Sequence, residues 1–363
     1  MRGLLGFGLV ALVVGCGGDT KDEASDSGQN SDSGGTEETG QETGQETGQE
    51  TGEPLSPEEQ QARDAYDTLK DGLSEADLAD PERIVAWAGT SAPNVMLTAY
   101  LPSLLISDQV NSWQMEGNAG LPDCPLLTGF NESGEATGIE WSVEGGCTDF
   151  RGMEWTGTLS QEMLDSTSIG LISQDFGQKS ESEACPGTFE SFRINGVTAM
   201  SGFEETMTMD ILFVANNEGP LPDADCAMAA TGGGFDVVLE RTTVMIDEAE
   251  ETTYSHDGEA LVLETTHSGF FDVKTEDEVM FETTCSTEAL SGTTTLTTSS
   301  HTAVIHYDGA TDCDEESTVT WTLDGEDQGE VSGVSCASTR RPLGAWVMVF
   351  GALIALRSRR RSD

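Results

Sequence analysis

The sequence predicts a mainly β protein: an antiparallel meander of about 10 to 14 strands, preceded by a short helical region. Beyond about residue 110 apolar and polar residues alternate, as where threonines separate Val319, Trp321 and Leu323. Similar runs cover 154–164, 206–214, 235–246, 259–266 and 293–307. Pairs that favour tight hairpin turns occur at Asn195-Gly196, Asp257-Gly258, Asp308-Gly309 and Asp324-Gly325. We expect the strand domain over 111–339, as a sheet that is curved or closed into a barrel-like or sandwich-like body; the pattern does not choose between an open sheet, a barrel and a sandwich.

Residues 1–15 have the build of a secretory signal peptide. One positive charge, Arg2, precedes an apolar run over 4–14, and a small residue then comes directly before Cys16. The sequence Val13-Val14-Gly15-Cys16 resembles the lipobox of bacterial lipoproteins. This resemblance implies cleavage before Cys16 and diacylation of that cysteine. The alternative is an ordinary signal peptide cut near the same place, and both interpretations place the chain outside the cytoplasm.

The residue after the cysteine bears on location. Gly17 is not the aspartate that holds some lipoproteins at the inner membrane, so the resemblance favours the outer membrane or the cell surface. Residues 16–55 then form an acidic segment without aromatic side chains, in which Glu-Thr-Gly-Gln repeats begin at Glu38. Such a composition cannot bury enough apolar surface to offset its chain entropy, so we expect a disordered tether.

The helical region is expected over 56–110. Ser56, Pro57 and Glu59 give a capping-box pattern at its start. The apolar residues that follow share one helical face, and they are Ala62, Ala65, Tyr66, Leu69 and Leu73. A second helix is expected after Asp80, and a third near 97–105, weakened by Pro102. These apolar faces should pack against the strand domain.

Seven cysteines follow Cys16, and disulfides are expected outside the cytoplasm. They are Cys124, Cys147, Cys185, Cys226, Cys285, Cys313 and Cys336. In a first account, Cys124 with Cys147 and Cys313 with Cys336 span equal intervals that each contain a tryptophan, which suggests related disulfide-bonded hairpins. That account leaves one unpaired cysteine among the remaining three.

The C-terminal segment, 340–363, supports a second account. An apolar run over 343–356 ends in an arginine cluster, and the order cysteine, apolar helix, arginines resembles the MYXO-CTERM sorting tails of myxobacterial surface proteins. The resemblance implies that Cys336 belongs to the processing signal, and that the other six pair as Cys124 with Cys147, Cys185 with Cys226, and Cys285 with Cys313. Cys336 lacks the usual glycine neighbour. A plain C-terminal membrane anchor with cytoplasmic arginines is the alternative.

The net charge and the absence of known catalytic motifs limit the classes of function that the sequence supports. The net charge of −50, with six of the 16 basic residues at the C-terminal end, makes nucleic acid and anionic lipid poor partners. No catalytic motif is found, so no catalytic residue is assigned. A crowded acidic turn makes Asp308, Asp312 and Asp314 weak candidates for structural calcium, and no other cofactor is expected.

Two classes of function stay open. The first is a non-enzymatic cell-envelope lipoprotein that binds a protein or small-molecule ligand or has a structural role. It would be held at the membrane through Cys16 and through the C-terminal helix if that helix is retained. The second is a secreted hydrolase whose catalytic residues are scattered along the chain. Convergent histidine and carboxylate groups in a pocket would favour the hydrolase.

Overall fold

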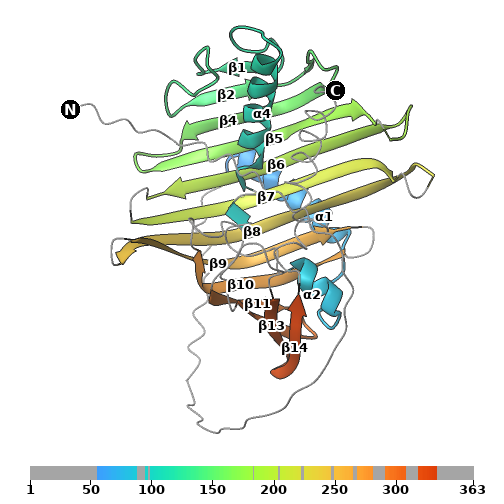
Figure 1. The fold of residues 1–363 in the computed structure, drawn as a ribbon, viewed down its shortest axis with the longest axis vertical. Coiled ribbons are helices and arrows are strands. Elements are labelled where there is room, and N and C mark those ends of the chain that lie inside the picture. The colour runs from blue at the N-terminus through green and yellow to red at the C-terminus, as the bar shows by residue number, and fades with distance from the viewer. Residues whose placement is uncertain are drawn as a thin grey trace. The chain divides into compact units, whose positions relative to one another are not determined.

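The computed structural model describes residues 55–332, except for 88–94, 97–98, 183, 203–204, 222–224, 247–248, 265–267, 281–290 and 308–317. In this part of the chain three helices precede the strands (Figure 1). They are α1 (Pro57–Asp71), α2 (Pro81–Trp87) and α4 (Leu101–Met115). Among the described residues, no helix combines the length and the apolar character needed to cross a membrane.

The strands form one antiparallel meander, as the sequence predicts. They are β1 (Leu126–Thr128), β2 (Trp141–Glu144), β3 (Cys147–Thr148), β4 (Glu154–Met163), β5 (Ser168–Glu181), β6 (Phe189–Ser201), β7 (Thr206–Leu221), β8 (Ala227–Ile246), β9 (Ala249–Leu263), β10 (Ser268–Met280), β11 (Ser291–Thr297), β12 (Thr302–Tyr307), β13 (Thr318–Leu323) and β14 (Glu326–Ser332). Each strand pairs with the next in sequence, with one exception: β2 and the short β3 both pair with β4. In the described residues the sheet is open, with β1 and β14 at its two ends (Figure 1), so of the three forms that the sequence leaves possible the open sheet is the one found.

Two of the predicted turns are wrong. Asn195-Gly196 lies inside β6 and Asp257-Gly258 inside β9, whereas Asp324-Gly325 does form the turn between β13 and β14. The glycines in these strands allow the neighbouring strand to come close. A Cβ on Gly258, for example, would lie 2.1 Å from the carbonyl oxygen of Asp236 in β8. Asp308-Gly309 lies outside the described residues.

Two other predictions differ in detail from the structure. The single run expected over 293–307 is a hairpin, β11 and β12, whose turn is closed by a 2.9 Å bond from Thr298 N to His301 O. The third helix runs on to Met115, past the expected boundary at 110, and Pro102 lies in its first turn. A proline there removes no helical hydrogen bond, because the first N–H groups of a helix have no partner within it.

The start of α1 follows the predicted capping box. Ser56 Oγ accepts a hydrogen bond from Glu59 N at 3.1 Å, and Glu59 Oε2 accepts one from Ser56 N at 2.8 Å. The two bonds satisfy orphan donors at the helix end and fix where the helix begins.

The two faces of the sheet carry different hydrophobic clusters, and β7 shows the division. Met209, Ile211 and Phe213 join the main core on one face, which we call the inner face, together with residues of α2 and α4. Leu212 and Val214 join a smaller cluster with α1 on the opposite, outer face. Figure 1 shows α4 in front of the sheet and α1 behind it.

A buried polar network holds α4 on the inner face. Gln109, which is fully buried in α4, donates to Cys124 O at 2.8 Å and accepts from Arg151. Arg151 also reaches Ser112 and Asp108 of α4. The Asp149 carboxylate accepts from the backbone N–H groups of Arg151 and Met153 at 2.8 and 2.9 Å, and from the indole of Trp155 at 3.2 Å. Both oxygens of this buried carboxylate therefore have hydrogen-bond donors, as buried polar groups require.

The chain passes from the outer to the inner face at residues 74–76. Ala76 N donates to Phe270 O, and Phe270 N donates to Ser74 O, both at 3.1 Å, so this segment makes a parallel bridge to β10. β11 pairs with β10 only from Asp272 onward. The bridge at Phe270 therefore lies on the same edge of β10, at the part of the strand that β11 does not reach. A Cβ on Gly269 would lie 2.6 Å from Ala76 Cα, so the crossing also needs that glycine.

Candidate functional site: a buried polar cluster on the inner face

Five polar side chains lie together on the otherwise apolar inner face. They come from four neighbouring strands and form what we call the inner polar cluster: His256 (β9), Thr275 and Glu278 (β10), Thr294 (β11) and Tyr307 (β12). Their relative exposures range from 0% to 9%, so every member is buried. Polar groups at this depth need internal partners, and such groups are the first place to look for function.

A β-bulge in β10 creates the cluster. On a regular strand Thr275 and Glu278, three residues apart, would face opposite sides of the sheet. The ladder with β9 shifts register between Thr275 and Glu278, the ladder with β11 shifts between Glu276 and Val279, and Asp277 has a φ of 52°. The extra residue turns Glu278 back to the inner face, directly across from Tyr254 of the main core.

Hydroxyl groups connect three members of the cluster. Thr275 lies opposite both His256 and Thr294 in the two ladders of β10. The Thr275 and Thr294 hydroxyls are hydrogen-bonded at 2.7 Å, and Thr294 Oγ1 is in turn bonded to the Tyr307 hydroxyl at 2.8 Å. Burial, and then the charge of Glu278, raise the pKa of Tyr307 above its ordinary value, so this phenol stays protonated.

His256 is the exceptional member of the cluster. In the part of the chain that the structure describes, neither ring nitrogen has a hydrogen-bond partner, and the residue is 2% exposed. Burial lowers the pKa of His256 to about 3, because the charged imidazolium would lose its hydration. The ring is therefore neutral at physiological pH.

The chemistry available to this arrangement is limited. A carboxylate, a neutral imidazole and a tyrosine hydroxyl could in principle transfer protons, but a general acid or base must reach its substrate. Here all five side chains are closed off within the packed inner face. Among the described residues, no three His, Cys, Asp or Glu side chains are grouped so that they could hold a metal ion. In the described structure the five side chains of the cluster are buried, and the three hydroxyl groups bond to one another.

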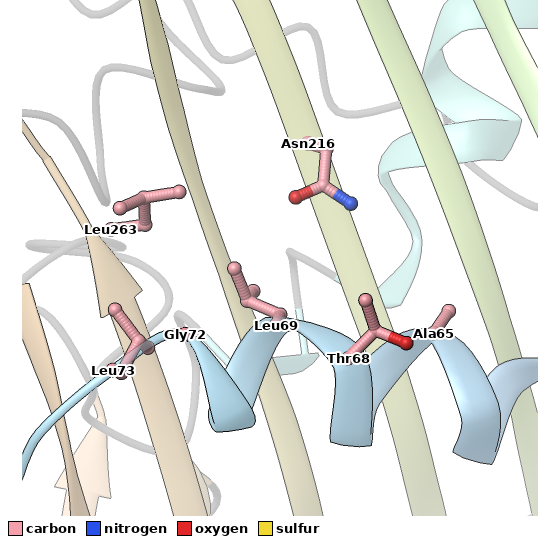
Figure 2. A pocket seen from close by; sticks show the side chains of 7 residues that line it. All are labelled: Ala65, Thr68, Leu69, Gly72, Leu73, Asn216 and Leu263. Carbon is pink, nitrogen blue, oxygen red and sulfur yellow. The ribbon is translucent and has the colours of Figure 1, made fainter.

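Two shallow hollows lie elsewhere on the surface. The first, of about 230 Å³, lies between the C-terminal half of α1 and the strands β7 and β9, and Figure 2 shows the labelled residues of α1 along one side of it and Asn216 and Leu263 on the strands across from the helix. It is lined by Ala65, Thr68, Leu69, Gly72, Leu73, Asn216 and Leu263. None of these side chains titrates, and the volume is below the usual range for small-molecule sites, about 300 to 1,000 Å³.

The second hollow, of about 300 Å³, lies beside the crossing segment and includes Glu75, Asp272 and Ser299. Both carboxylate oxygens of Glu75 accept hydrogen bonds from Ser299, from its N–H and from its hydroxyl, so Glu75 is committed to the β11–β12 turn. Neither hollow contains a histidine.

The structure contains two of the expected disulfides. Cys124–Cys147 joins the segment before β1 to β3, as in both accounts, and Cys185–Cys226 joins the β5–β6 turn to the segment just before β8, as the sorting-tail resemblance implies. Cys285, Cys313 and Cys336 lie outside the described residues. So do Cys16 and the calcium candidates Asp308, Asp312 and Asp314.

Sequence reasoning missed the inner polar cluster. It assigned no role to His256, Thr275 or Glu278. The available signal was weak: the alternation of β10 breaks at Glu276-Asp277-Glu278, where three acidic residues occupy adjacent positions.

Comparison with known proteins gives no match, whether to a family model, a curated protein or a solved structure.

Proposed function

We propose that this chain is a lipid-anchored module of a bacterial cell envelope, exposed outside the cytoplasm, and that it acts by binding or by structure rather than by catalysis. The acylated Cys16 would anchor it, and residues 16–55 would carry the folded part away from the membrane. This follows from the signal sequence and the composition of residues 1–55.

The proposal that the protein is not an enzyme is supported mainly by the packing of the inner face, which side chains fill. Large side chains from strands across the sheet pack there, including Trp155, Phe176, Phe213, Phe271 and Trp321, all at 3% exposure or less. An apolar face of this size could line a lipid cavity, but here α2, α4 and the facing side chains occupy it. What the described part offers to a partner is thus the outer face and the strand ends.

Charge supports the same proposal. The net charge of −50 repels anionic lipid surfaces, so an acidic module on an acidic tether would be held away from the membrane that anchors it. Several of the few cations are already paired within the fold: Arg63 with Asp236, Lys70 with Glu259, and Lys274 with Glu276. A protein or small-molecule partner with positive groups would suit this surface best.

Membrane fractionation tests the anchor. The variant Cys16→Ser removes the acylated thiol and should move the protein from the membrane fraction to the soluble fraction. Cys336→Ser is the matched control, because it alters the C-terminal signal and leaves the lipobox intact. If Cys16→Ser stays in the membrane while Cys336→Ser leaves it, the lipobox proposal is wrong and the C-terminal segment is the anchor.

The secreted-hydrolase alternative has one observation in its favour, the burial of His256, Glu278 and Tyr307 on nearby strands of the same face of the sheet. It requires that reagents reach His256 in the folded protein. Diethyl pyrocarbonate should modify the exposed His306 and leave His256 unmodified until the protein unfolds. Modification of both at similar rates would reopen the hydrolase interpretation.

A further inference from the structure

The contacts of α1 with the outer face include several polar side-chain pairs as well as apolar packing. At its N-terminal half, the Gln61 amide donates to Asp175 Oδ2 at 3.2 Å and to Asn195 Oδ1 at 3.1 Å. Arg63 pairs with Asp236 of β8 at 2.5 Å. These contacts connect one helix to three strands, β5, β6 and β8.

Farther along α1, Glu259 of β9 accepts two bonds. The Tyr66 hydroxyl donates to Glu259 Oε1 at 2.9 Å, and Lys70 Nζ lies 2.5 Å from Oε2. Lys70 also lies over the ring of Phe270, with its nitrogen 5.0 Å from the ring centroid. The side chains of Arg63, Asp236 and Lys70 are each about one-third exposed, so water and salt can weaken both ion pairs.

The apolar part of this contact is small and separate from the main core. Only Ala62 and Tyr66 of α1 are fully buried. They pack on a short stripe formed by Ile172, Val197, Leu212, Val214 and Leu261. Gly234 permits this approach, because its missing Cβ would lie 3.3 Å from the Tyr66 ring. In the described residues this outer cluster shares no buried member with the core on the inner face.

The chain after α1 is held independently. The bridge between residues 74–76 and Phe270 pins the chain to β10 directly beyond the helix. Glu75 is fixed in addition by its two bonds to Ser299. If α1 leaves the sheet, the separation can therefore stop at Ser74 without disturbing α2 or the inner face.

We propose that α1 is a releasable strap: it opens as a unit while the sheet stays folded, and its release uncovers the apolar stripe on the outer face. The inference rests on the contacts of α1 and does not depend on acylation of Cys16. A pull on the N-terminal side of the chain would act first on α1, because α1 is the first element of the described part. The stripe is then a surface that becomes accessible only when the strap is open.

Hydrogen exchange on the full-length protein tests the strap. The α1 amides should exchange through a local opening, faster than the central amides of β7 and β8. Arg63→Met and Lys70→Met should each raise the exchange rate of the α1 amides about two- to fivefold. The two sites lie about 10 Å apart along the helix, so in the double variant the factors should multiply. Lys274→Met is the matched control, because it removes an exposed ion pair within β10.

Two results would overturn the proposal. One is that the α1 amides exchange at the rate of the β7 amides and respond to neither substitution, which would mean that α1 opens only when the sheet unfolds. The other is that Lys274→Met raises α1 exchange as much as Lys70→Met does, which would make the effect one of net charge.

Limited trypsin digestion of the unaltered protein provides a second readout. Cleavage within α1, at Arg63 and Lys70, should come before cleavage at Lys179 and Arg193 in β5 and β6, since each α1 site needs only local opening. Simultaneous cleavage of the two sets of sites would contradict a releasable strap.

Discussion

Replacing His256 with leucine should remove an acid sensitivity that the native imidazole gives to the fold. Burial holds the pKa of this ring at about 3 in the folded protein, whereas an unfolded chain has a histidine pKa of about 6.5. Because the folded pKa lies below the unfolded one, the unfolded chain takes up the proton first. Stability is therefore unaffected above pH 6.5 and is lost as the pH falls toward 3.

The size of the effect follows from the same two pKa values. At pH 5, about 1.5 units below the unfolded pKa, the native protein should lose about 2 kcal/mol relative to the leucine variant, at about 1.36 kcal/mol per unit. At pH 8 the substitution should change stability by less than about 1 kcal/mol. It removes two nitrogens that have no hydrogen-bond partner in the described part of the chain and keeps a side chain of similar size.

Urea unfolding followed by tryptophan fluorescence at pH 8, 7, 6 and 5 measures the difference between the two proteins. The many carboxylates titrate in the same way in the native protein and in the leucine variant, so their contribution cancels when the two free energies of unfolding are subtracted. A difference that stays constant over this range would refute the argument that His256 is held neutral by burial. A loss of about 2 kcal/mol or more at pH 8 would instead show that the ring nitrogens have a stabilising partner.

Three further substitutions test the packing, each by the urea midpoint. Asp149→Ala should lower the free energy of unfolding by about 3 kcal/mol, because it leaves the backbone N–H groups of Arg151 and Met153 and the buried indole of Trp155 without their acceptor; a loss below about 1 kcal/mol would contradict this. Gly258→Ala should destabilise by about 2 to 4 kcal/mol because of its contact with the β8 backbone, whereas Gly138→Ala, with no atom within 4 Å, should be neutral; equal effects would exclude the steric argument. The paired change of Cys185 and Cys226 to serine should remove about 4 kcal/mol, as expected for a cross-link over 41 positions, and an unchanged midpoint would show that this disulfide does not stabilise the fold.

The parts of the fold that follow local rules were predictable. The capping box at Ser56 sets the start of α1 through two hydrogen bonds that depend only on residues three apart. Short strands with alternating residues gave the meander, because neighbouring antiparallel strands are connected by short turns. The Asp324-Gly325 turn agrees with that rule, since both residues have positive φ.

The rest depends on contacts between strands, which the local sequence does not encode. The central residues of β7, 211–215, are all buried because both faces of the sheet are covered there. Such a run does not alternate, and it cannot reveal that α1 lies on one face and α4 on the other. Asp257-Gly258 has the sequence of a turn, but Gly258 lies inside β9. The glycine is needed there because the neighbouring strand β8 leaves no room for a side chain, and the local sequence does not show this contact. The inner polar cluster depends on a single bulge at Asp277, and without it Thr275 and Glu278 would lie on opposite faces.

Intact and peptide mass spectrometry of the protein isolated from its native membrane tests the central proposal most directly, because it reports both chain ends and the disulfides together. We predict an N-terminal Cys16 that carries acyl chains, together with the Cys124–Cys147 and Cys185–Cys226 bonds. A chain that ends near Cys336 would favour the sorting tail, and one that retains residues 357–361 would favour a C-terminal membrane anchor. An unmodified N-terminus would contradict the lipid anchor and leave the C-terminal segment as the remaining candidate for attachment to the membrane.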